Sequence, residues 1–91
     1  MEIKHYELRI YGRVQGVGFR YAARTRAREL GLAGWVENMA DGSVNAAVQG
    51  RSEACHSFIG WCREGTGYSW VEKVDVEEKP LARFQGFSIR R

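Results

Sequence analysis

The sequence predicts an α+β domain in which two helices pack on one face of an antiparallel sheet. Segments whose apolar and polar residues alternate, as in half-buried strands, are interrupted by two segments with helical spacing. Their order is strand, helix, strand, strand, helix, strand, with a short extra strand at the C-terminus. This is the order of a ferredoxin-like βαββαβ sandwich. The length suits one domain over residues 1–91.

The first strand is expected over residues 6–14, where apolar residues alternate with glutamate and arginine. Gly16 and Gly18 follow and relax the backbone. A helix is expected over about residues 19–30, because alanines and larger apolar residues recur there at helical spacing. Gly31 is its C-terminal stop.

The second and third strands are expected over residues 32–39 and 43–49, joined by a hairpin at Asp41 and Gly42. The second helix is expected over residues 52–64. Ser52 is its predicted N-cap and Gly65 its predicted stop. Its predicted buried residues are Ala54, Phe58, Trp61 and Cys62.

The last two strands are expected over residues 70–78, ending before Pro80, and over residues 84–90. Cys55 and Cys62 lie seven residues apart on the second helix, about 10.5 Å along its axis. A disulfide needs closer Cα atoms, so no bridge between them is expected. No metal site is expected either, because no ligand cluster accompanies them.

The composition is that of an ordinary globular protein with a formal charge of +3. This mild excess favours anionic partners without indicating nucleic acid. The sequence contains no apolar run of membrane-spanning length and no signal-peptide pattern, so a cytoplasmic protein is expected.

The connection between the first strand and the first helix is the strongest candidate site. It contains Gln15, Gly16, Val17, Gly18, Phe19 and Arg20. The first N–H groups of a helix have no partners within it and lie at the positive end of its dipole, so an anion fits there. Arg20 can add a planar fork to two phosphate oxygens. By spacing alone, a plain turn carrying a surface arginine remains the alternative, since neither common nucleotide-binding glycine pattern is present.

Two segments make the chain resemble an acylphosphatase: GRVQGVGFR (residues 12–20) and GWVEN (residues 34–38), which is followed by DGSV and QG. The ending FSIR is similar as well. The resemblance covers essentially the whole chain. It implies a small free-standing hydrolase that cleaves the carboxyl-phosphate bond of acyl phosphates without a cofactor or metal.

By this resemblance, Arg20 and the backbone amides of Gln15 to Phe19 bind the substrate phosphate, and Asn38 orients the attacking water. These roles suit the reaction, because the leaving carboxylate is a weak base and needs no general acid to protonate it. The alternative for Asn38 is a structural role at the end of the strand, where its side chain would form hydrogen bonds within the hairpin at residues 41–42. The loop over residues 65–69 lacks the proline usual in the family, and Trp70 replaces a small or basic side chain.

Other residues of interest are expected to be structural. His5 and His56 are taken as surface or boundary residues. The stripe of Arg20, Arg24 and Arg28 is taken as a solvated face, although it could also raise the local potential around an anionic substrate. The packing residues are expected to include all three tryptophans: Trp35, Trp61 and Trp70.

Three other functions are alternatives to the hydrolase. One is a module that binds an anion without chemistry, which would not need Asn38. Another is an RNA-recognition module, disfavoured because residues 43–50 contain no aromatic to stack bases. The third is the corresponding domain of a longer carbamoyl-transferring maturation enzyme, disfavoured by the length of this chain. The expected partners are an acyl phosphate and inorganic phosphate as product or inhibitor, with the protein a monomer.

Overall fold

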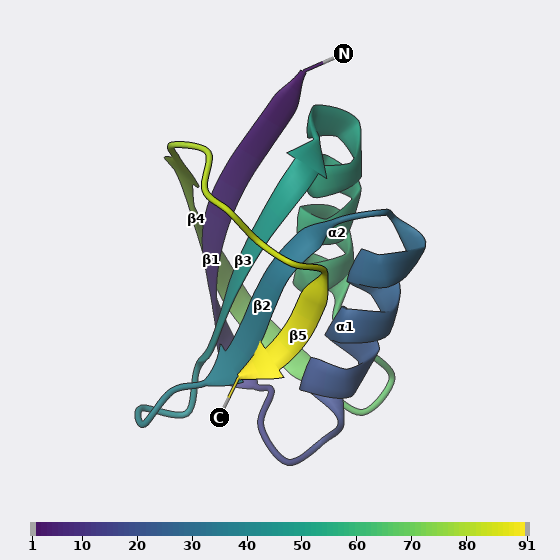
Figure 1. The fold of residues 1–91 in the computed structure, drawn as a ribbon. Helices are drawn as coiled ribbons and strands as arrows, with labels where there is room; N and C mark the ends of the chain where they lie inside the picture. The colour runs from purple at the N-terminus through teal and green to yellow at the C-terminus, as the bar shows by residue number, and fades with distance from the viewer. Residues whose placement is uncertain (1, 91) are drawn as a thin grey trace.

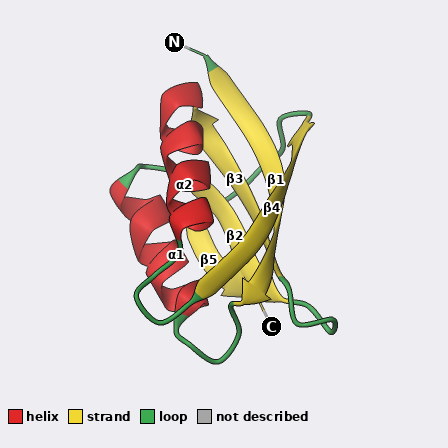
Figure 2. Ribbon diagram, turned by 180° about the vertical axis from the view of Figure 1, so that it is seen from behind, coloured by secondary structure: helices red, strands yellow, loops and turns green. Residues whose placement is uncertain are grey.

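Two helices pack on one face of a five-stranded sheet in the computed structural model, which describes residues 2–90 (Figure 1). The strand order is β4-β1-β3-β2-β5. Seen from behind, both helices lie on the same side of the sheet (Figure 2). This confirms the predicted ferredoxin-like sandwich. The elements are β1 (Ile3–Arg13), α1 (Phe19–Glu29), β2 (Ala33–Asn38), β3 (Val44–Arg51), α2 (Ser52–Glu64), β4 (Trp70–Lys79) and β5 (Phe87–Arg90).

The extra C-terminal strand makes the sheet mixed. Strands β1 to β4 pair antiparallel, whereas β5 pairs parallel with β2. The connection over residues 80–86 crosses the face of the sheet opposite the helices before β5 begins (Figure 1). Strand β5 is therefore shorter than the predicted residues 84–90, because the first of those residues belong to the crossing.

The core fills the space between the helices and the sheet. Helix α1 contributes Phe19, Ala23 and Ala27. Helix α2 has the predicted bounds, but its buried residues are Cys55, Phe58, Ile59 and Cys62. The predicted stripe was therefore wrong at Ala54 and Trp61, which are half-buried at the margin of the core.

The start of α2 differs from the prediction. Strand β3 continues to Arg51, which becomes the N-cap with extended backbone angles and no side-chain cap. The Ser52 amide donates to the Glu2 carbonyl at 2.9 Å. The assignment of Ser52 as N-cap was thus wrong, because strand and helix join without a turn between them. The predicted stop at Gly65 is confirmed as the C-cap.

Both cysteines are free, as their spacing predicted. They are fully buried, and burial raises the pKa of each thiol. Within residues 2–90, no group of three or more histidines, cysteines, aspartates or glutamates is placed to hold a metal ion. None of the helices in this range is long and apolar enough to cross a membrane.

His5 is buried, with 5% of its surface exposed, so its prediction as a surface or boundary residue was wrong. The crossing over residues 80–86 covers it. His5 Nδ1 lies 2.7 Å from the Pro80 carbonyl oxygen, and the ring meets Phe84 edge-on. Nearby, Gln49 exchanges two hydrogen bonds with the Ala82 backbone, at 2.8 and 2.9 Å. His56 is exposed, as expected.

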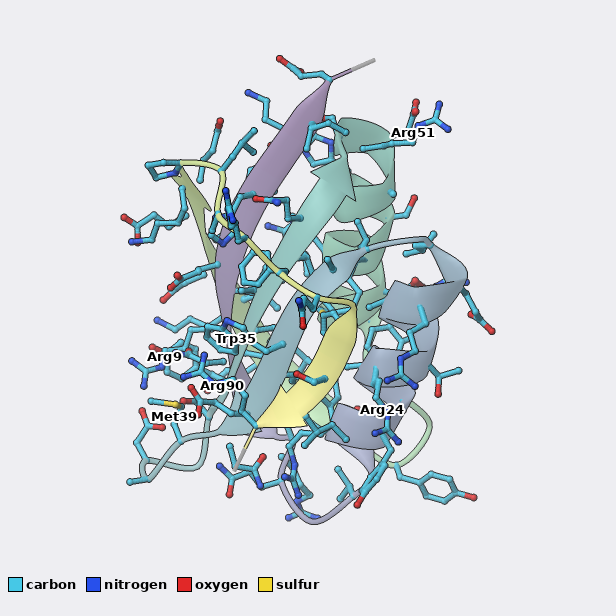
Figure 3. The ribbon with its side chains drawn as sticks, viewed as in Figure 1. Arg9, Arg24, Trp35, Met39, Arg51 and Arg90 are labelled. Atoms are coloured by element: carbon cyan, nitrogen blue, oxygen red, sulfur yellow. The ribbon has the colours of Figure 1, made fainter. Side chains whose placement is uncertain are left out.

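The three tryptophans have different surroundings. Trp61 packs beside two core phenylalanines. Trp35 lies on the open face of the sheet, where the Arg90 guanidinium stacks 4.2 Å from its ring centroid (Figure 3). Trp70 is 63% exposed at the start of β4, so its prediction as a packing residue was wrong. At that position β4 has only β1 beside it.

The arginine stripe on α1 is only partly a solvated face. Arg28 donates to the Phe87 carbonyl oxygen at 2.9 Å, which ties α1 to β5. Arg24 lies beside the exposed Tyr21 ring, 5.3 Å from its centroid. Arg20 remains at the N-terminal end of the helix.

Candidate active site

The loop between β1 and α1 depends on two glycines. Gly16 has φ of 74° and Gly18 has φ of 79°, both in the left-handed region. A Cβ placed at either position would meet nothing within 4 Å. Glycine is therefore needed for the backbone angles, and the space beside both residues stays open to a ligand.

The loop ends in an uncapped helix N-terminus. Gly18 is the N-cap of α1 and makes no side-chain cap hydrogen bond, and no acidic residue lies in the first turn. The first bond that closes the helix runs from the Ala22 amide to the Gly18 carbonyl, at 3.1 Å. No acceptor within residues 2–90 takes a hydrogen bond from the amides of residues 15–20. These amides can therefore bind an anion.

The side chains of the loop fix its backbone. Phe19 is 1% exposed and reaches the core, and Val17 packs against the core margin. Both side chains point away from solvent, which leaves their amides as the groups available to a ligand. The predicted cradle over residues 15–19 therefore lies on a loop that two apolar side chains anchor to the core.

Arg20 is the second residue of α1 and is half-buried. Its guanidinium makes no ion pair or hydrogen bond with any group in the described part of the chain. A cation at a helix N-terminus opposes the helix dipole, which is unfavourable unless an anion lies between them. Arg20 and the loop amides therefore both belong to the N-terminal end of α1, where no acidic side chain of residues 2–90 pairs with the guanidinium.

Asn38 is the last residue of β2, where it pairs with Val44. Its Oδ1 atom is buried and has no hydrogen-bond donor anywhere in residues 2–90. A buried acceptor without a donor costs about 1–3 kcal/mol. The structure therefore contains an asparagine oxygen that its own fold does not use.

The hydrogen bonds of the hairpin after Asn38 are made by other residues. The Asp41 carboxylate accepts hydrogen bonds from the Ser43 hydroxyl and amide, and these lower its pKa. The Gly42 amide donates to the Met39 carbonyl at 3.2 Å, and the Met39 amide donates to the Ser43 carbonyl at 2.9 Å. The alternative role for Asn38, in which it stabilises this hairpin, has no support in these contacts.

The glycine loop and the hairpin lie at the same end of the sheet (Figure 1). One side chain joins them. Gln15 Nε2 donates to the carbonyl oxygens of Met39 and Ser43, both at 2.8 Å. The sequence indicated Gln15 only through its backbone amide. Its side-chain contacts reach 24 and 28 residues along the chain and leave no local pattern that could have revealed them.

The loop between α2 and β4, whose conformation the sequence left open, forms a closed turn. The Thr66 amide donates to Ser69 Oγ at 2.7 Å, and the Ser69 amide donates to the Thr66 carbonyl at 3.2 Å. Gly65 precedes it with φ of 75°. Serine and threonine thus supply the turn without a proline.

A shallow depression of about 220 Å³ lies on the sheet between β1, β3 and β4. Glu7, Asp75 and Glu77 line it together with Arg9. Three carboxylates disfavour a phosphate group there. The electropositive loop is therefore the better candidate, although it is an open surface.

Comparison with known proteins shows the family of this chain. The family model described as acylphosphatase matches residues 6–89. A protein of Roseiflexus sp. strain RS-1 named acylphosphatase is 46% identical over 90 residues, which are 98% of this chain and 97% of that protein. The crystal structure of an acylphosphatase from Bacillus subtilis superposes with a TM-score of 0.93 at 37% identity and covers 99% of this chain and 100% of that one.

The same fold also occurs inside a much longer chain. A crystal structure of full-length HypF, in a phosphate- and nucleotide-bound form, superposes with a TM-score of 0.88 at 26% identity. It covers 99% of this chain but 12% of that one. The match is thus to one domain of that protein, whereas the two relatives above match over nearly their whole length.

Proposed function

Because this chain belongs to the acylphosphatase family and is a hydrolase acting on acyl phosphates, we propose that Arg20 and Asn38 are its catalytic residues. Arg20 and the backbone amides of residues 15–19 bind the phosphoryl group of the substrate. Asn38 orients the water that attacks phosphorus. The products are a carboxylate and inorganic phosphate.

Binding of the phosphoryl group follows from the charges at the loop. The free amides of residues 15–19 and the dipole of α1 attract its oxygens. The Arg20 guanidinium can hold two of these oxygens through parallel N–H groups. As negative charge develops during the reaction, donors already in position stabilise it without rearranging.

The water is positioned by Asn38. Its unpaired Oδ1 can accept a hydrogen bond from a water, which leaves a water lone pair free to face phosphorus. A neutral amide cannot remove a proton, so a phosphoryl oxygen of the substrate accepts the proton of the water. The new P–O bond forms to the water, and the P–O bond to the acyl group breaks with its electrons leaving on the carboxylate.

The buried, unpaired Oδ1 of Asn38 is the observation that carries this proposal. A module that only binds anions would have no use for a residue that orients a water. Turnover of acetyl phosphate and benzoyl phosphate tests the proposal in the wild type and in Arg20→Ala. The wild type should release phosphate and the variant should lose both binding and turnover. Phosphate binding by the wild type without turnover would support the binding module instead.

We also propose that the enzyme acts as a cytoplasmic monomer on a small-molecule acyl phosphate, without a metal or cofactor. Inorganic phosphate, which fits the same loop, should compete with the substrate. RNA is not a proposed partner, because the central strand β3 carries no aromatic residue.

A further inference from the structure

The two halves of the proposed site come from segments far apart in the sequence. The phosphate loop follows β1, and Asn38 lies at the end of β2. Strand β3 lies between β1 and β2 in the sheet, so these two strands do not pair with each other. In-line attack requires the water and the phosphorus to be aligned within a fraction of an ångström. A contact that fixes the loop relative to the hairpin therefore matters for the reaction.

The side chain of Gln15 makes that contact. Its Nε2 atom bridges two carbonyl oxygens of the hairpin, those of Met39 and Ser43. Met39 directly follows Asn38 in the chain. Within residues 2–90, no other side chain is hydrogen-bonded between residues 14–18 and residues 39–43. Both distances are 2.8 Å, so the bridge is well formed.

We propose that Gln15 is a positioning residue, whose side chain holds the phosphate loop and Asn38 in register for attack. The inference rests on the proposed roles of the loop and of Asn38. The main chain and the side chain of Gln15 then have separate tasks, because its amide belongs to the cradle while its side chain faces the hairpin. Loss of the side chain should leave phosphate binding intact and slow the chemical step.

The fold should tolerate this loss. The Met39 carbonyl also accepts from the Gly42 amide at 3.2 Å, and the Ser43 carbonyl also accepts from the Met39 amide at 2.9 Å. No hairpin carbonyl would be left without a donor. Arg9 Nε donates to Ser43 Oγ at 3.1 Å, which holds the hairpin against β1 independently. A Gln15 variant should therefore fold with its hairpin closed but free to shift against the loop.

The test is Gln15→Leu, which keeps the approximate size of the side chain and removes the donor. We expect kcat for benzoyl phosphate to fall between about 10-fold and 10²-fold, the scale of a small misplacement. The inhibition constant of inorganic phosphate should change by no more than about 2-fold, the limit for independent sites. A fall in phosphate affinity equal to the fall in kcat would overturn the proposal, because Gln15 would then shape the cradle itself.

Gln49→Leu is the matched control. Gln49 also bonds twice to backbone, at Ala82, but its contacts hold the crossing over residues 80–86 against the sheet. Its substitution removes a comparable pair of hydrogen bonds away from the loop and the hairpin. We expect kcat to stay at the wild-type value. An equal loss of kcat in both variants would show general destabilisation and would overturn the positioning role.

A double-mutant cycle separates this inference from the function on which it rests. If Gln15 acts through Asn38, Gln15→Leu should cost no more than about 2-fold in kcat when Asn38→Ala is already present. Full, additive losses would overturn the positioning role and leave the function standing. Wild-type kcat in Asn38→Ala alone would overturn the proposed function instead.

Discussion

Replacing Asn38 by alanine should impair the enzyme without weakening its fold. The side-chain oxygen is buried and unpaired, a condition that costs about 1–3 kcal/mol in the folded state. Alanine removes that oxygen and keeps the Cβ atom, so no aliphatic group leaves the core. We therefore expect the free energy of unfolding to stay the same or to rise by about 1 kcal/mol, because the desolvation penalty disappears.

The activity should change in the opposite direction. Removing one positioned polar group from an active site typically costs about 10²-fold to 10³-fold in kcat. Because the proposed role of Asn38 is to contact the water rather than the phosphate, affinity for inorganic phosphate should stay nearly unchanged. The combination of a stable fold, intact binding and lost turnover distinguishes a water-orienting residue from a structural one.

Three measurements on the purified protein test this prediction. Urea unfolding gives the stability, calorimetry with inorganic phosphate gives the affinity, and steady-state hydrolysis of benzoyl phosphate gives kcat. Asn45→Ala is the matched control, since Asn45 is a half-buried asparagine on β3 that pairs with Glu37 on the neighbouring strand. That variant should keep the wild-type kcat.

Two results would refute the reasoning. A loss of more than about 1 kcal/mol in Asn38→Ala would mean that the side chain has a donor in solution and serves the fold. Disappearance of phosphate binding together with activity would mean that Asn38 holds the phosphate. The separate assignment of phosphate binding to the loop and of water orientation to Asn38 would then be wrong.

Three further predictions concern the phosphate cradle. Arg20→Ala should lose phosphate binding and turnover, and Arg20→Lys should restore little because an ammonium lacks the bidentate fork; wild-type kcat in either variant would contradict the assignment. Activity should survive exhaustive treatment with EDTA, since arginine and amides neutralise the phosphate, and recovery of lost activity with a divalent ion would count against the mechanism. Acetyl phosphate should be hydrolysed much faster than glycerol phosphate at similar affinity, because an alkoxide needs a general acid to leave. Comparable kcat values for the two substrates would point to a general acid, with Glu37 and Asp41 the first candidates.

Most of the fold could be predicted from local patterns. The bounds of α2 follow from its helical spacing and from Gly65, and the hairpin follows from Asp41 and Gly42. What the sequence could not reveal depends on distant segments. The burial of His5 is caused by residues 80–86, which form neither strand nor helix, although the first part of the predicted last strand, residues 84–86, lies among them.

The candidate site likewise combines residues that local sequence indicated with a contact that depends on distant segments. Arg20 and Asn38 were proposed from motif residues, and the structure adds that each carries an unpaired polar group. The bridge from Gln15 to the hairpin was not foreseen, because the two segments meet only after β1, β3 and β2 have assembled. Local sequence thus indicated which chemical groups to consider but gave no account of what aligns them.

The last strand has a consequence for self-association. Without β5, strand β2 would form an edge of the sheet, and its free backbone groups could pair with another molecule. Four residues, Phe87–Arg90, cover that edge, and the Arg28 bond to Phe87 holds them in place. The opposite edge, β4, has no covering strand but carries charges of both signs along most of its length. One edge of the sheet is therefore protected from pairing with another molecule by a covering strand, and the other by charged side chains. Loss of residues 87–90 should favour aggregation through β2.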